Sequence, residues 1–375
     1  MSVDSDSIKP ARGAPPRSES PANLVRDNVR TMHGYTPGEQ PGLGERVVKL
    51  NTNENPFPPS PKVMQALREV EAEHLRKYPN PVGQPFRVAA AKLWNLSPEN
   101  FITGNGSDDI LTIATRTFVP PGGTLAFPSP TYSLYNVLAA LEQAVVAAVP
   151  WDSGYSLPIE ALIKTNARAI YLANPNAPTG TFVAPAEIAR LAAAFPGLVL
   201  IDEAYADFAD GNCVSLVSKF ENVVVSRTLS KAYSLAGLRF GYAIAQPHII
   251  EEMMKVKDSY NCDVLSIVAA TAAIEDQEYA RSCWDMVKAE RDRVTNELEA
   301  IGCHVVPSHG NFVLAGIPGG NGKAAYQGLK AKGILVRYFD SPGLTDKIRI
   351  TIGTANENNA LIAGLASLVS NQKAA

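Results

Sequence analysis

The chain has 375 residues, of which 46% are hydrophobic and 19% are charged, a composition typical of a soluble globular protein with a large core. This length allows one large domain or two ordinary domains. A net charge of -3 gives no reason to expect nucleic-acid binding, and no basic run predicts a membrane surface. The four cysteines form no C-x-x-C pair and the five histidines are dispersed, which argues against a metal site and a disulfide framework.

The first 22 residues are rich in serine, proline and charge and lack the apolar stretch of a secretory signal. We therefore expect residues 1–22 to form a disordered tail. No apolar run reaches the roughly 18 residues of a membrane span. Together with the cysteine usage, these features favour a cytoplasmic protein that does not enter the membrane.

Residues 60–78 predict an amphipathic helix, with Ser60 as its cap and Pro61 at its first position. From about residue 100 onward, short apolar runs alternate with helical patterns. The runs lie at 101–103, 124–127, 144–149, 169–173, 198–202, 222–226 and 238–245. Because these runs are continuously apolar and are separated by helices, they indicate an α/β protein with a mainly parallel sheet covered on both faces.

The pattern changes after about residue 260. Long helical stretches at 263–275 and 278–301 precede several short strand patterns and a final helix. This order is typical of a smaller α+β domain. We therefore expect a large domain over residues 53–262 and a small domain over residues 263–375.

Four polar motifs follow predicted strands: GNGSDD (104–109), NPNAPTG (174–180), DEAYADF (202–208) and SRTLSK (226–231). Each motif alone has an ordinary structural explanation, as a helix start, a pair of turns, a cap or a solvated lysine. In parallel sheets, however, ligands bind beyond the carboxyl ends of the strands. Four polar clusters at one sheet edge therefore predict a small-molecule site.

These motifs together offer a phosphate cradle at a helix start, a carboxylate and an amine. Pyridoxal phosphate needs all three, because its aldehyde forms a Schiff base with a lysine and its ring nitrogen requires an acid. Asp202 supplies the carboxylate and Lys231 the amine, and small neighbours let the cofactor approach Lys231 closely. The residues expected around the phosphate are Ser107, Asp108, Thr228, Ser230 and Arg239.

The order GSDD, PTYSLY, NPNAPTG, DEAY, SRTLSK, GLRFGY and KIRITIGT resembles the fold-type I pyridoxal-phosphate aminotransferases. The segments HGYTPG, LNTNENPFPPSP, RKYPNP and GILVRYFDSPGLTDKIRITIGT are similar to the histidinol-phosphate aminotransferase family in particular. The resemblance extends from about residue 24 to the C-terminus. It implies the fold-type I architecture, with an N-terminal arm (23–52) that packs on the small domain and the substrate site.

The resemblance assigns roles around the cofactor by position. Lys231 would be the Schiff-base lysine and the catalytic proton shuttle, and Asp202 would pair with the pyridine nitrogen. Tyr205 would hydrogen-bond the 3′ oxygen of the ring, while Tyr132 would stack on the ring.

Further residues are implied at the substrate and at a second subunit. Tyr78 would reach the cofactor phosphate of the neighbouring subunit, which implies a homodimer. Arg349 would bind the α-carboxylate of glutamate, and Tyr35 and Arg337 would help to bind substrate groups. No metal is implied.

One position departs from the family pattern. Many relatives have asparagine directly before Pro-Thr-Gly, where it contacts the 3′ oxygen, but here that position is Ala177. Either Asn176 or Asn174 turns inward, or Tyr205 makes the contact alone. We predict Asn176, and the alternative that both asparagines only shape turns stays open.

The resemblance implies a ping-pong transamination of L-histidinol phosphate and 2-oxoglutarate to imidazole-acetol phosphate and L-glutamate. One pocket then binds a phosphate in one half-reaction and a carboxylate in the other, and arginine suits both anions. An aromatic amino-acid aminotransferase or an O-phosphothreonine decarboxylase of the same fold is the alternative. A cofactor-sensing module without turnover is disfavoured, because Lys231, Asp202 and Arg239 are all present.

Overall fold

The computed structural model describes residues 21–42 and 44–374. The tail predicted for residues 1–22 lies outside the described residues, apart from Pro21 and Ala22, which begin the short 3-10 helix η1 (Pro21–Leu24). None of the helices in the described ranges is long and apolar enough to cross a membrane.

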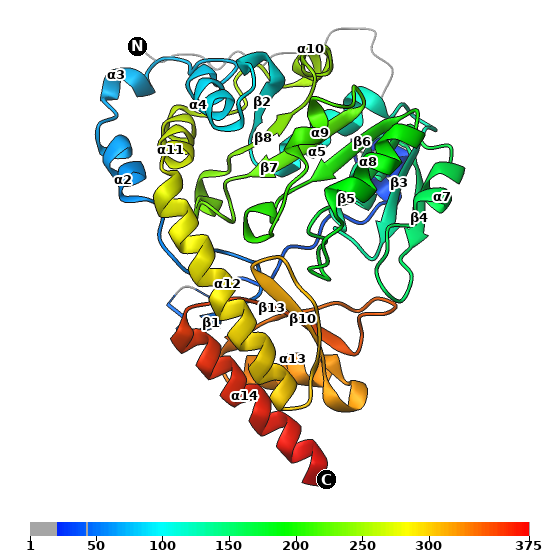
Figure 1. The fold of residues 1–375 in the computed structure, drawn as a ribbon, viewed down its shortest axis with the longest axis vertical. Coiled ribbons are helices and arrows are strands. Elements are labelled where there is room, and N and C mark those ends of the chain that lie inside the picture. Colours follow the sequence, from blue (N-terminus) through cyan, green and yellow to red (C-terminus); the bar gives the residue numbers. More distant parts are fainter. Residues whose placement is uncertain (1–20, 43, 375) are drawn as a thin grey trace, which may run out of the picture.

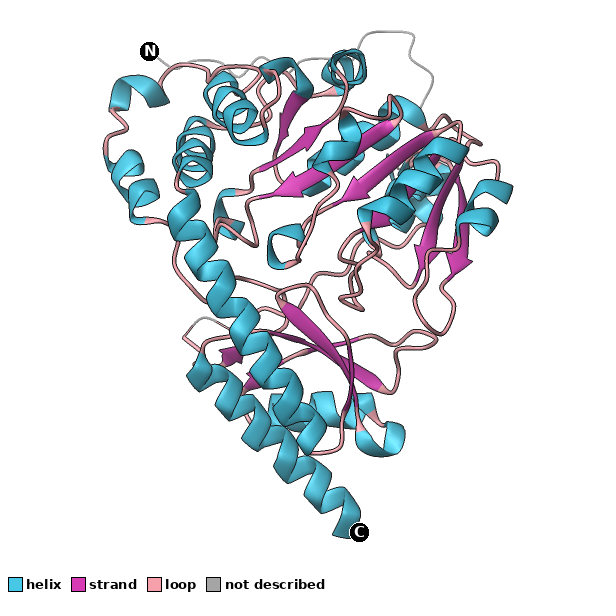
Figure 2. Cartoon of the chain, viewed as in Figure 1, coloured by secondary structure: helices cyan, strands magenta, loops and turns pink. Residues whose placement is uncertain are grey.

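A seven-stranded sheet forms the centre of the larger part of the molecule (Figures 1 and 2). Its strand order is β2-β8-β7-β6-β5-β3-β4. The strands are β2 (Phe101–Gly104), β3 (Thr124–Ser129), β4 (Val145–Pro150), β5 (Ala169–Ala173), β6 (Leu198–Asp202), β7 (Val223–Thr228) and β8 (Gly241–Ile244). Only β8 runs against its neighbours among these strands, so the predicted mainly parallel sheet is confirmed.

Both faces of the sheet are apolar, which explains why the strands read as continuous apolar runs. In β6, Leu198 and Leu200 face one core, while Val199 and Ile201 face the other. The first core includes residues of α5 (Ser107–Phe118), α6 (Leu134–Leu141) and α10 (Pro247–Val256). The second includes residues of α4 (Gln84–Trp94), α7 (Ile159–Lys164), α8 (Pro185–Ala194) and α9 (Val214–Val217).

The single helix predicted over residues 60–78 is wrong, because the segment forms α2 (Pro61–Arg68) and α3 (Ala72–Leu75). The start was predicted correctly: Ser60 Oγ accepts a hydrogen bond from Lys62 N (3.1 Å), and proline occupies the first turn. The break arises because Glu71 and His74 form a capping box that begins a new helix.

A second, antiparallel sheet has the order β12-β13-β10-β9. These strands are β9 (His304–Val306), β10 (Phe312–Gly316), β12 (Arg337–Tyr338) and β13 (Lys347–Thr351). Helices α13 (Gly322–Ala331) and α14 (Ala355–Ala374) pack nearby, and β1 (Val48–Lys49) pairs in parallel with β11 (Ile334–Leu335). The remaining short helices are α1 (Asp27–Thr31), η2 (Pro98–Asn100), η3 (Ala206–Phe208), η4 (Ala236–Leu238) and η5 (Pro318–Gly320).

Helices α11 (Val264–Glu275) and α12 (Gln277–Ala300) lie where the second domain was predicted to begin. Helix α11 packs against α2 and α4, beside the seven-stranded sheet. Helix α12 runs from there to the second sheet, and α14 lies alongside it (Figure 1). The domain boundary at residue 263 stays a prediction.

A buried ion cluster lies behind the carboxyl edge of the large sheet. Arg227 in β7 donates to both Glu203 and Asp207, and the exposed fraction of its side chain is 3%. Its guanidinium also lies 4.8 Å from the ring centre of Trp94. Because buried charges are stable only when they are paired, this cluster connects β7 to the segment that follows β6.

We predict that Arg227→Met lowers the free energy of unfolding by about 3–5 kcal/mol, because it leaves two buried carboxylates without their cation. Arg190→Met is the matched control, since Arg190 pairs with Glu187 on the surface and such pairs are worth at most about 1 kcal/mol. Urea denaturation measures both. Equal, small losses in the two variants would contradict the stabilising role of the cluster.

Candidate active site

Two glycines bring the start of β8 against the start of α5. A Cβ added to Gly241 would lie 2.5 Å from Ser107 N, and one added to Gly106 would lie 2.5 Å from Arg239 Nη2. Gly106 also has a φ of +82°, which favours glycine. The N–H groups in the first turn of α5 and the Arg239 guanidinium therefore lie next to each other, an arrangement that binds anions.

The residues predicted around a phosphate come together at this position. Arg239 donates from Nη1 to Ser230 Oγ (3.1 Å), and its Nη2 lies 3.5 Å from Asp108 Oδ2. Thr228 Oγ1 accepts from Ser230 N (3.1 Å). Ser107 is the first residue of α5. We call these five residues the anion cradle.

Asp202 ends β6 at the same edge of the sheet. Its carboxyl is buried and accepts from Tyr135 OH (3.1 Å) and from Ala204 N (3.3 Å). Burial raises the pKa of Asp202 to about 7. A cation beside this carboxyl would hold it ionised, which fits a protonated ring nitrogen. Sequence reasoning missed Tyr135, although it lies in the PTYSLY motif.

Lys231 follows β7 and lies between the anion cradle and the N-terminal arm. Its Nζ donates to Thr52 O (2.8 Å). Burial lowers the pKa of Lys231 to about 8; Glu54 opposes this shift and Arg349 adds to it. An amine with a lowered pKa is a better nucleophile and base near neutral pH.

Tyr205 lies behind the site with its hydroxyl held by a residue that sequence reasoning missed. Asn53 Nδ2 donates to Tyr205 OH (3.0 Å). The ring of Tyr205 packs edge-on against Phe312, with ring centres 4.9 Å apart. Burial raises the pKa of Tyr205, so the hydroxyl stays protonated. Asn53 lies in the segment LNTNENPFPPSP, which carries the family resemblance. Its contact with Tyr205, however, joins residues far apart in the chain.

Tyr132 and Tyr35 lie on the open side of the site. Tyr132 OH donates to Asp108 Oδ1 (3.1 Å), which places its ring beside the anion cradle. The Tyr35 ring meets the Tyr132 ring edge-on, with centres 5.8 Å apart, and is 42% exposed. The N-terminal arm therefore reaches the predicted substrate side of the site.

Arg337 and Arg349 lie directly opposite each other in β12 and β13, so their side chains leave the same face of the sheet. Arg349 Nη2 donates to Asn51 O (3.0 Å), while its Nε is buried and has no hydrogen-bond partner among the described residues. Arg337 instead donates to the carbonyls of Thr36 and Pro37 (3.0 Å each). Like charges placed opposite each other are unfavourable, and an anion at Arg349 would relieve this repulsion.

The expectation that Asn176 turns inward is corrected by the structure. Its Nδ2 donates to Pro130 O (3.1 Å) and to Thr179 Oγ1 (2.8 Å), so both amide hydrogens are used within the loops. Asn174 also binds backbone groups of its own loop. The two asparagines shape turns, and neither replaces the donor missing at Ala177.

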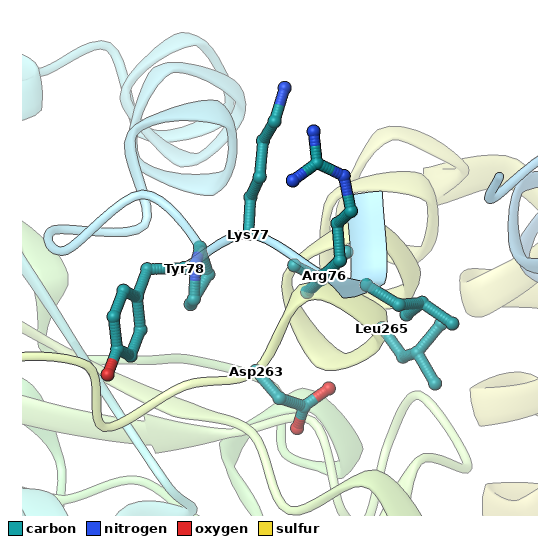
Figure 3. Close-up of a pocket in the computed structure, with 8 residues that line it drawn as sticks. Arg76, Lys77, Tyr78, Asp263 and Leu265 are labelled. Atoms are coloured by element: carbon teal, nitrogen blue, oxygen red, sulfur yellow. The ribbon is translucent and has the colours of Figure 1, made fainter. Parts of the chain in front are cut away.

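Tyr78 lies on the surface rather than in the anion cradle of its own chain. It is 80% exposed and stacks on Tyr260, with ring centres 4.4 Å apart. In Figure 3, Arg76 and Lys77 point to one side of this segment, and Tyr78 and Asp263 point to the other. A surface pocket of about 500 Å³ lies here. Its lining residues are Leu75, Arg76, Lys77, Tyr78, Pro79, Asp263, Val264 and Leu265.

Comparison with known proteins shows which family the chain belongs to. The profile of the class I and II aminotransferases matches residues 45–365. Histidinol-phosphate aminotransferase 1 of Trichormus variabilis is 45% identical over 347 residues, which cover 92% of this chain and 99% of that protein. The Rhodopirellula baltica histidinol-phosphate aminotransferase is 44% identical over 89% of this chain and 93% of its own length. The chain belongs to the histidinol-phosphate aminotransferase family.

Solved structures of aminotransferases share the fold. The histidinol-phosphate aminotransferase of Sinorhizobium meliloti, in complex with pyridoxal-5'-phosphate, has a TM-score of 0.84 and 25% identity. The match covers 96% of this chain and all of that one. A Thermus thermophilus aspartate aminotransferase double mutant matches with a TM-score of 0.77 and 21% identity. The predicted fold-type I architecture is thus confirmed for this member of the aminotransferase family.

We predict that the Lys231 amine of this aminotransferase becomes half neutral near pH 8, because its pKa is lowered from 10.5 to about 8. Brief reductive methylation of protein freed of pyridoxal phosphate, at a series of pH values and followed by mass spectrometry of the Lys231 peptide, measures the midpoint. The urea-unfolded chain is the control, and its midpoint is expected to return toward 10.5. The same midpoint in both states would show that the fold does not perturb this amine.

Proposed function

We propose that this aminotransferase uses pyridoxal phosphate to convert L-histidinol phosphate and 2-oxoglutarate into imidazole-acetol phosphate and L-glutamate. One observation carries the proposal: the amine of Lys231, with its lowered pKa, stands at one sheet edge with an anion cradle and the buried carboxyl of Asp202. Relatives named histidinol-phosphate aminotransferase, 45% and 44% identical over most of the chain, support the choice of substrate.

The residues present fit this cofactor. The anion cradle would hold its phosphate, and Asp202 would lie beside its ring nitrogen. Lys231 would meet its aldehyde, and Tyr205 its 3′ oxygen. When bound, the cofactor supplies an electron sink for the carbanion that forms next to the substrate amino group.

The side chain of Lys231 moves the proton in this scheme. In its neutral form, Nζ would take the proton from the α carbon of the substrate and hold it for delivery to C4′, the aldehyde carbon of the cofactor. Burial lowers the pKa of Lys231 to about 8, so a useful fraction of the amine is neutral near pH 7. Asp202 stays ionised beside the ring cation, because an opposite charge favours the carboxylate.

The two arginines select anionic substrates. Arg349 offers a buried Nε that has no partner among the described residues, and its planar guanidinium can donate to either a phosphate or a carboxylate. Arg337 holds the arm carbonyls of Thr36 and Pro37. The arm, with Tyr35, would then cover the substrate and exclude water from the carbanion step.

The enzyme would act as a cytoplasmic homodimer. The exposed ring of Tyr78 would reach the cofactor phosphate bound by the second subunit. Leu75, which is 59% exposed on the same pocket, would become buried in that contact. Large exposed apolar side chains grouped in this way are typical of protein interfaces.

The function predicts a two-step spectral response. Adding L-histidinol phosphate alone to the cofactor-loaded protein is expected to remove the visible absorption band, and 2-oxoglutarate is expected to restore it. Lys231→Ala should show neither change and should lose turnover by at least about 10³-fold, because it lacks both nucleophile and base.

If the visible absorption band of the wild-type protein does not change when histidinol phosphate is added, the substrate assignment is overturned. A response to aromatic amino acids would then indicate an aromatic aminotransferase. Carbon dioxide released from O-phosphothreonine without 2-oxoglutarate would indicate a decarboxylase.

We predict that Arg349→Ala raises the KM for glutamate about 10- to 100-fold, the cost of losing a charged hydrogen bond, while the Kd for the cofactor changes little. Arg337→Ala is the matched control on the opposite strand. It should raise KM less, because its guanidinium binds the arm carbonyls in this structure. Steady-state kinetics and cofactor titration separate the two effects. Unchanged glutamate kinetics in Arg349→Ala would remove this residue from the pocket.

A further inference from the structure

Three consecutive residues, Asn51, Thr52 and Asn53, connect the N-terminal arm to the active site. Toward the site, the first two offer their backbone carbonyls as acceptors, and the third offers its side-chain amide as a donor. Their partners are, in chain order, Arg349, Lys231 and Tyr205. This segment therefore contacts the anion-binding, proton-transfer and ring-oxygen positions of the proposed site, yet only Asn53 does so through its side chain.

Asn53 is held in one orientation. It is fully buried and has a φ of +57°, a conformation that asparagine tolerates better than most residues. Its N donates to Thr351 Oγ1 (3.0 Å), and its carbonyl accepts from Asn311 Nδ2 (3.0 Å). The hydroxyl of Thr351 in turn donates to Asn53 Oδ1 (3.0 Å). If the Asn53 amide were rotated by 180°, the buried hydroxyl of Thr351 would lose Oδ1 as its acceptor. The amide therefore keeps the orientation in which Nδ2 faces Tyr205.

This orientation decides what the hydroxyl of Tyr205 can do. A phenol has one hydrogen to donate and lone pairs that accept. Because Asn53 Nδ2 donates to Tyr205 OH, the hydroxyl hydrogen cannot point at Asn53 and must be donated elsewhere. The side chain of Ala177 has no donor, and both amide hydrogens of Asn176 are used in the loops. Since neither Ala177 nor Asn176 can donate to the 3′ oxygen of the cofactor through its side chain, the hydroxyl of Tyr205 is the donor available to it.

We propose that Asn53 is a positioning residue that directs the hydroxyl hydrogen of Tyr205 toward the 3′ oxygen of the cofactor and so compensates for the amide absent at Ala177. The inference rests on the proposed function. Thr351 and Arg349 lie two residues apart in β13, so one strand of the second sheet holds both Asn53 and the substrate anion.

The test compares wild type, Asn53→Asp, Tyr205→Phe and the double variant, each loaded with pyridoxal phosphate. Asparagine and aspartate have similar shapes and both tolerate positive φ, but the carboxylate accepts the hydroxyl hydrogen instead of donating to the oxygen. The measurement is the pH midpoint of the visible absorption band. A hydrogen bond donated to an anionic ring oxygen lowers that midpoint, so losing it in Asn53→Asp or Tyr205→Phe should raise the midpoint by about one unit.

The double variant separates positioning from charge. If Asn53 acts through Tyr205, the double variant has the same midpoint as Tyr205→Phe; a further rise would mean that the new charge acts directly and would overturn the proposal. Asn53→Gly, which also accepts the φ of +57°, gives a second variant that lacks the donor, and a smaller rise is expected there.

A midpoint in Asn53→Asp and Asn53→Gly equal to that of wild type, with Tyr205→Phe still shifted, would also overturn the proposal while leaving the proposed function intact. If the wild-type protein, loaded with pyridoxal phosphate, shows no visible absorption band that is lost in Lys231→Ala, the proposed function is refuted. The positioning role of Asn53 is then refuted with it.

Discussion

The active site depends on the close contact between two backbones, at Gly241 and at Gly106–Ser107. Neither glycine can carry a side chain without a collision, and this closeness brings Arg239 over the first turn of α5. The cradle then combines a guanidinium charge with the N–H groups of a helix start. Asp202 and Lys231 reach the same edge because β6 and β7 are parallel neighbours.

Burial acts on the two central ionisable groups in opposite directions. It raises the pKa of Asp202 to about 7 and lowers that of Lys231 to about 8, because a low-dielectric environment disfavours both charged forms. Each group is thereby suited to a partner that restores its interactions: a ring cation for the carboxyl and an aldehyde for the amine. The buried Arg227 cluster joins the strand that precedes Lys231 to the segment that follows Asp202.

The N-terminal arm and the second sheet complete a site that the large sheet alone would leave open. Arg337 binds the arm at Thr36 and Pro37, and Thr351 holds Asn53. Both contacts come from neighbouring strands of one small antiparallel sheet. A movement of that sheet would therefore shift Arg337, Arg349 and the Asn53–Tyr205 contact together.

Much of this protein followed from its sequence, because apolar runs and strand-end motifs are local signals. The runs located the large-sheet strands to within a few residues, α5 begins at Ser107 within the GNGSDD motif, and the motifs placed Lys231, Asp202 and Arg239 at one edge. The tertiary structure alone decided the rest. The capping box at Glu71 divided a helix that looked continuous, and the loop contacts of Asn176 kept its amide out of the site. The Asn53–Tyr205 hydrogen bond joins residues 152 positions apart, and no local pattern encodes such a pairing, because it exists only once two sheets and the arm have packed together.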